Sequence, residues 1–139
     1  MTITEIQDQI VDEFSMFDDW MERYEYIIEL GKKLPLINEE FKTDDNIIKG
    51  CQSKVWLKGE QNNDIIVFTA DSDAILTKGI IAILIRAFSN QKAADNLAAN
   101  MGFIDEIGLK EHLSPTRANG LVSMIKNIKM YALAFDAKN

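Results

Sequence analysis

The sequence predicts an α+β fold of two layers, in which a small antiparallel sheet packs against N-terminal and C-terminal helices. Apolar residues recur at helical spacing in the first third of the chain, strand-like alternation replaces that spacing near the middle, and helical spacing then returns. The chain of 139 residues has the length of one domain, and no repeat, linker or low-complexity segment divides it. We therefore expect a single domain over residues 1–139.

Two helices are expected in the N-terminal third. Thr2 and Glu5 have the spacing of a capping box and precede apolar residues at helical intervals. Asp18 or Asp19 begins the second helix, which carries an aromatic and aliphatic face and stops before Pro35. Core packing is the simplest interpretation of both apolar faces.

A β-hairpin is expected next. Residues 54–58 alternate in polarity, and residues 65–69 are rich in β-branched and aromatic side chains. The residues between them, 59–64, have the composition of a turn. The sequence therefore predicts two antiparallel strands joined by this segment.

Helices return after the hairpin. Asp71 or Asp73 is expected to cap a third helix, residues 92–99 form a weaker helical stretch, and a further turn is expected near residues 103–107. Ser114 and Pro115 supply a capping residue and a first-turn proline for the last helix. Its expected inner face consists of Leu121, Met124, Ile125, Ile128, Ala132 and Phe135.

Composition excludes several classes of function. Fifteen basic against 22 acidic residues leave a net charge of -7, which disfavours nucleic acids and anionic membranes as partners. With one cysteine, Cys51, and one histidine, His112, the chain cannot form a disulfide framework, a structural zinc site or a cysteine-ligated iron–sulfur site. We expect no metal and no cofactor. The apolar run 79–85 is too short to span a membrane, and no secretory signal begins the sequence, so the expected compartment is the cytoplasm.

Cys51 is the first candidate for chemistry, because it lies where a polar loop leads into the first strand. Gly50 lets the backbone turn there and leaves space around the sulfur. Lys49 and Lys54 flank the cysteine and would favour its thiolate, the nucleophilic form. A small buried cysteine without reactivity is the competing interpretation.

Three further residues are candidates for supporting roles. His112 is either a base for Cys51, as in a Cys–His pair, or a surface or capping residue. Arg117 stands at a helix start, where its charge opposes the helix dipole, which indicates a role such as steadying an acidic loop or a thiolate. Asp73 belongs to an acidic pair with Asp71, for which helix capping is favoured over metal binding.

At these residues the chain resembles the SufE family of sulfur acceptors, which serve cysteine desulfurases in iron–sulfur cluster assembly. The resemblance runs from about Trp20 to Tyr131 and is weak only over residues 92–110. Four collinear motifs carry it: Gly50-Cys51-Gln52-Ser53 with Val55-Trp56; Tyr26-Ile27-Ile28-Glu29-Leu30-Gly31 with Leu34-Pro35; Asp71-Ser72-Asp73-Ala74 with Lys78-Gly79; and His112-Leu113-Ser114-Pro115 with Arg117 and Gly120-Leu121.

The resemblance implies a fold related to the scaffold proteins of cluster assembly and a role for Cys51 as persulfide acceptor. The donor would be a pyridoxal-phosphate cysteine desulfurase, whose turnover the acceptor stimulates, and the recipient an iron–sulfur scaffold complex. The chain would thus be a persulfide carrier and an activator of the desulfurase, not an enzyme. A weak homodimer of the chain is compatible with this role. A single thiol suits this role, because a second cysteine would discharge the persulfide as a disulfide.

The same resemblance implies that Cys51 rests in an apolar recess, lined by Val55, Trp56 and the flanking helices, until the desulfurase draws the loop outward. Supporting roles fall to Arg117, Asp73 and His112, and to three neighbours of the cysteine, namely Gly50, Gln52 and Ser53. Two other functions stay open: a redox-active single-thiol protein, and a structural interaction module with an inert cysteine.

Overall fold

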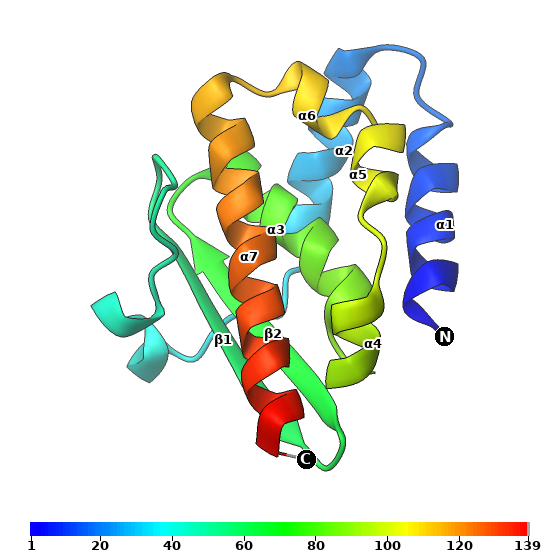
Figure 1. Ribbon diagram of the computed structural model, residues 1–139. Helices are drawn as coiled ribbons and strands as arrows, with labels where there is room; N and C mark the ends of the chain where they lie inside the picture. The colour runs from blue at the N-terminus through cyan, green and yellow to red at the C-terminus, as the bar shows by residue number, and fades with distance from the viewer. Residues whose placement is uncertain (139) are drawn as a thin grey trace.

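A computed structural model, which describes residues 1–138, shows helices, a β-hairpin and further helices in that order (Figure 1). A short strand after the third helix completes a three-stranded antiparallel sheet. The α+β prediction is confirmed. The helices are α1 Ile3–Phe14, α2 Trp20–Gly31, α3 Ile75–Phe88, α4 Ala93–Ala98, α5 Gly102–Glu106, α6 Leu109–His112 and α7 Pro115–Lys138, and the strands are β1 Val55–Asn62, β2 Ile65–Ser72 and β3 Gln91–Lys92. Two 3₁₀ turns, η1 Glu39–Phe41 and η2 Asp44–Asn46, lie between α2 and β1.

Local sequence signals place the first two helices correctly. Thr2 and Glu5 form the expected reciprocal capping box at the start of α1. Asp19, one of the two expected candidates, caps α2 by accepting a hydrogen bond from the backbone N–H of Glu22. These contacts join residues three apart, so the short-range sequence pattern is sufficient to predict them.

The hairpin differs from the prediction in the length of its turn. The first strand, β1, continues through residues 59–62, and Asn63 and Asp64 alone join it to β2, with Asn63 in the left-handed region at φ 57°. Gly59 belongs to the strand because a Cβ there would lie 2.9 Å from ring carbons of Phe68 and Tyr131. The antiparallel hairpin is confirmed, but the predicted turn over 59–64 is too long, since this glycine serves close packing rather than chain reversal.

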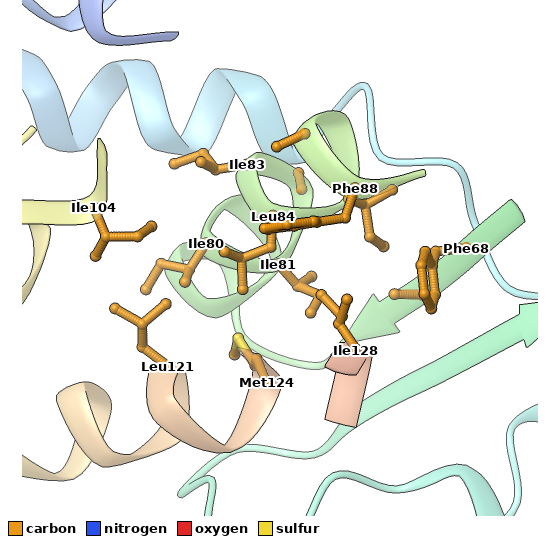
Figure 2. Close-up of a cluster of buried hydrophobic side chains, with 14 of the residues drawn as sticks. Phe68, Ile80, Ile81, Ile83, Leu84, Phe88, Ile104, Leu121, Met124 and Ile128 are labelled. Atoms are coloured by element: carbon orange, nitrogen blue, oxygen red, sulfur yellow. The ribbon is translucent and has the colours of Figure 1, made fainter. Parts of the chain in front are cut away.

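The hydrophobic core is centred on α3, which packs against α1, α2, α7 and β2 (Figure 2). The main contacts of α1 and α2 are with α3, so these helices lie on the side of α3 away from the sheet. Core residues labelled in Figure 2 come from β2, α3, α5 and α7 and are almost fully buried: Phe68, Ile80, Ile81, Ile83, Leu84, Phe88, Ile104, Leu121, Met124 and Ile128.

The start of α3 contradicts the expected helix cap. The residue before the helix is Ala74, and no side chain caps it. Asp71 instead lies within β2, one residue before its end, where its carboxylate is 2.6 Å from the ammonium of Lys42 and 3.4 Å from that of Lys78. The other candidate, Asp73, is bonded to the loop that contains Cys51.

The region with the weak family resemblance contains short helices. The expected helical stretch at 92–99 is α4, and the expected turn at 103–107 is α5. The third helix of this region, α6, was not predicted; it begins after Gly108, which has a φ of 73°. None of the helices within residues 1–138 combines the length and apolar character that crossing a bilayer requires.

Candidate functional site around Cys51

Cys51 lies in a short loop, residues 49–54, that is closed at its base by main-chain bonds. The N–H of Ile48 donates to the carbonyl oxygen of Val55 at 2.8 Å, and Ile47 forms an antiparallel bridge with Trp56. The segment before the loop therefore runs beside the first residues of β1. We call residues 49–54 the Cys51 loop.

Gly50 is required by the path of this loop. Its φ is 92°, in the left-handed region that residues with a side chain rarely adopt. A Cβ at this position would also lie 2.7 Å from the hydroxyl oxygen of Ser123 on α7. The backbone thus turns at Gly50, as the sequence predicted, and the turn lies next to α7 and brings Cys51 against that helix.

Asp73 holds the C-terminal end of the loop. Its carboxylate accepts a hydrogen bond from the backbone N–H of Lys54 at 3.1 Å, and its own N–H donates to the Lys54 carbonyl at 3.2 Å. The hydroxyl of Ser72 donates to the same carbonyl at 2.9 Å. Lys54 is therefore bound by its main chain to the segment between β2 and α3.

The Cys51 thiol is half-buried against the first turns of α7. Its Sγ donates a weak hydrogen bond to the carbonyl oxygen of Gly120 at 3.7 Å. Burial raises the pKa of the Cys51 thiol, and neither Lys49 nor Lys54 contributes an opposing effect. In this conformation the cysteine is a protonated, sheltered thiol rather than an activated nucleophile.

A small pocket of about 20 Å³ adjoins Cys51. By volume it has room for about one water-sized group. Its wall is formed by Cys51, Gln52, Ser53, Thr77, Ile80, Thr116, Arg117, Gly120 and Met124. The expected lining is thus partly wrong: Val55 is fully buried in the core, and Trp56 lies beside Lys42, whereas α3 and α7 supply the apolar wall.

Of the candidate supporting residues, Arg117 lies at this pocket and His112 does not. Within residues 1–138 the guanidinium of Arg117 has no carboxylate partner. His112 stacks on Trp20 with ring centroids 4.0 Å apart, and its Nδ1 lies 3.0 Å from the carbonyl oxygen of Gly108. The structure therefore does not bring Cys51 and His112 together as a nucleophile and base.

The sequence did not single out Thr77, Ile80, Thr116 or Met124 as site residues. Their contribution depends on how α3 and α7 pack beside the loop. One signal was present: Thr77 is a polar residue on the inward row of α3, three and seven positions before Ile80 and Leu84. Among residues 1–138, no three or more histidine, cysteine, aspartate or glutamate side chains gather where they could hold a metal ion.

Comparisons with known proteins agree on one family. The model of the family described as "SufE: Fe-S metabolism associated domain" matches residues 8–132. An uncharacterized SufE-like protein of Rhizobium meliloti is 42% identical over 130 residues, covering 90% of this chain and 93% of the relative. Another, of Rhizobium etli, is 46% identical over 128 residues, covering 88% and 86%.

A solved structure shares the fold. The solution structure of a hypothetical protein from Thermus thermophilus superposes with a TM-score of 0.79, at 16% sequence identity, over 95% of this chain and 96% of the other. At this identity the likeness concerns the fold alone. The family assignment therefore rests on the sequence matches, and the solved structure supports the fold.

Proposed function

The chain belongs to the SufE family, whose domain is associated with iron–sulfur metabolism, and from this premise we propose that it is a sulfur acceptor for a cysteine desulfurase. Cys51 receives the sulfur as a persulfide and passes it to an iron–sulfur scaffold. The observation that carries the proposal is the position of Cys51, half-buried beside a pocket that has room for about one further atom and that Arg117 lines. The protein then acts in the cytoplasm, where thiols stay reduced.

The transfer is an exchange between sulfur atoms. The Cys51 thiolate attacks the terminal sulfur of a persulfide on the desulfurase's own cysteine. A bond forms between the Cys51 sulfur and the terminal sulfur as the sulfur–sulfur bond of the desulfurase persulfide breaks. The cysteine sulfur of the desulfurase leaves with the electron pair of that bond and takes up a proton. The proton of Cys51 passes to solvent, and no external oxidant or reductant is consumed.

Several features of the loop suit this exchange. Cys51 is the sole cysteine of the chain, so no second thiol of the chain can discharge the persulfide. The guanidinium of Arg117 supplies a positive charge beside the place where a persulfide anion would form. A turn at Gly50 and the bonds between Lys54 and Asp73 allow the loop to be released as a unit when the desulfurase binds.

The raised pKa separates this proposal from the redox alternative. A peroxide-sensing cysteine needs thiolate character in the free protein, because oxidation follows the thiolate. Burial has the opposite effect on Cys51. In the sulfur-acceptor proposal, the partner supplies the activation by drawing the thiol out of its shelter.

The test is mass spectrometry after incubation with a pyridoxal-phosphate cysteine desulfurase and free cysteine. The expected product carries one extra sulfur on Cys51, and the desulfurase turns over faster. Cys51→Ser, a nearly isosteric change, is expected to stay folded, to gain no sulfur and to give no stimulation. Full stimulation by this variant, or a wild type that gains no sulfur, would overturn the proposal.

A further inference from the structure

Thr77 is the one polar side chain of the pocket wall that is more than nine-tenths buried. It is 6% exposed and lies in α3, and it shares the pocket wall with Ile80 and with Met124 of α7, which are 1% and 2% exposed. No hydrogen bond joins the Thr77 hydroxyl to any other residue within 1–138. The hydroxyl oxygen is not among the fully buried polar atoms of residues 1–138 that lack a partner, so it keeps some access to solvent at the pocket that Thr77 lines.

The size and place of the pocket indicate what the hydroxyl is for. A sulfur–sulfur bond is about 2.0 Å long, so the second sulfur of a persulfide lies just beyond Sγ. The pocket beside Cys51 has a volume of about 20 Å³. It is therefore of the size needed for one added atom. Persulfides are more acidic than thiols, so this atom carries negative charge at neutral pH and accepts hydrogen bonds.

We propose that the Thr77 hydroxyl donates a hydrogen bond to the terminal sulfur of a persulfide on Cys51 and so holds this sulfur in the pocket. The inference rests on the proposed function and adds a residue to it. In the free protein the Cys51 thiol is bonded to the Gly120 carbonyl instead. Thr77 thus acts on the loaded protein and leaves the unloaded thiol unaffected.

The experiment loads Cys51 with inorganic tetrasulfide, without a desulfurase, and follows the acidity of the persulfide by the pH dependence of its alkylation with iodoacetamide. Thr77→Val removes the hydroxyl and keeps the shape. It is expected to lower the acid dissociation constant of the persulfide about tenfold, the effect of one hydrogen bond to a charged group. Thr77→Ser keeps the hydroxyl and is expected to remain within about twofold of the wild type.

Two controls separate this role from a structural one. The unloaded thiol is expected to show the same pH profile in the wild type and in both Thr77 variants, and Thr77→Val is expected to unfold at nearly the same temperature as the wild type. Thr69→Val, in β2 and outside the pocket wall, is expected to change neither profile.

Three outcomes would overturn the inference. These are persulfides of equal acidity in the wild type and in Thr77→Val, a shift that also appears in the unloaded thiol, or a Cys51 that takes up no sulfur from tetrasulfide. Failure of a desulfurase to load Cys51 while tetrasulfide succeeds would instead count against the proposed function alone.

Discussion

Cys51 and Gly120, 69 positions apart in the sequence, are in direct contact. The Cys51 Sγ lies 3.7 Å from the Gly120 carbonyl oxygen, and a Cβ on Gly120 would lie 3.3 Å from that sulfur. Helix α7 therefore approaches the thiol as closely as it does because residue 120 has no side chain. This contact shelters the Cys51 thiol from solvent.

Gly120→Ala is expected to crowd Cys51 and loosen its loop, so that the thiol is alkylated several-fold faster by iodoacetamide. Alanine favours a helix by about 1 kcal/mol over glycine, which offsets part of the steric cost in the free energy of unfolding. The matched control is Asn119→Ala, an exposed neighbour on the same helix. Equal labelling rates in Gly120→Ala and wild type would show that this contact does not shelter the thiol.

The alkylation rate of wild-type Cys51 is expected to rise with pH around a midpoint above that of an ordinary cysteine, because burial raises the pKa of the thiol. The chain unfolded in urea supplies the reference midpoint. Between the two pKa values only the unfolded chain loses this proton, so the free energy of unfolding falls as pH rises through that window. If the folded and unfolded chains showed the same midpoint, burial would not be what sets the pKa of the Cys51 thiol.

Asp73 is expected to act as a latch on the Cys51 loop. Asp73→Asn keeps an oxygen acceptor for the Lys54 N–H, whereas Asp73→Arg removes it. Both the labelling rate of Cys51 and the affinity for the desulfurase are expected to rise, more for arginine than for asparagine, because less energy is needed to release the loop.

The control for Asp73→Arg is Asp8→Arg, which makes the same change of charge at an exposed position of α1. It is expected to leave labelling and affinity near the wild-type values. A fall in thermal stability with no gain in labelling would mean that Asp73 only supports the local fold.

Glu13 is expected to stabilise the contact between α1 and α3 in a pH-dependent way. Arg86 donates to both carboxylate oxygens, at 2.6 and 2.5 Å, and Tyr26 also donates to this carboxylate. The hydrogen bonds from Arg86 are the main cause that lowers the pKa of Glu13. The resulting stabilisation is present above the unfolded-state pKa and is lost as pH falls through the folded-state value.

Glu13→Gln is therefore expected to lower the free energy of unfolding at pH 7 by roughly 1–3 kcal/mol. The difference from wild type should shrink as pH falls below about 4. Urea unfolding at several pH values measures both, with the exposed Glu106→Gln as control. A difference that persists unchanged at low pH would show that the ionised carboxylate is not responsible.

The features that could be predicted from the sequence depend on residues near each other along the chain. The box of Thr2 and Glu5, the cap at Asp19 and the turn at Gly50 each involve interactions within a few positions or the backbone freedom of one residue. Apolar periodicity likewise predicted α3 and the hairpin. The motif around Cys51 identified the candidate nucleophile before any spatial information was needed.

The features that could not be predicted depend on contacts between distant segments. Gly59 is of a residue type that is common in turns, yet it lies in a strand. The rings of Phe68 and Tyr131 occupy the space that a side chain at position 59 would fill. Asp73 is of a residue type that often caps helices, yet its carboxylate accepts a hydrogen bond from the backbone of Lys54, 19 positions earlier. In both cases the residue type fits two roles, and packing selects between them.

At Cys51, some properties come from nearby residues and others come from contacts between distant segments. Residue types and local spacing are sufficient to propose a reactive cysteine on a glycine turn, because nucleophilicity and backbone freedom belong to the residues themselves. The raised pKa, the pocket and the buried Thr77 arise only when α3 and α7 pack beside the loop. Burial and hydrogen-bond partners are properties of the space around a group, and residues far away in the sequence create that space.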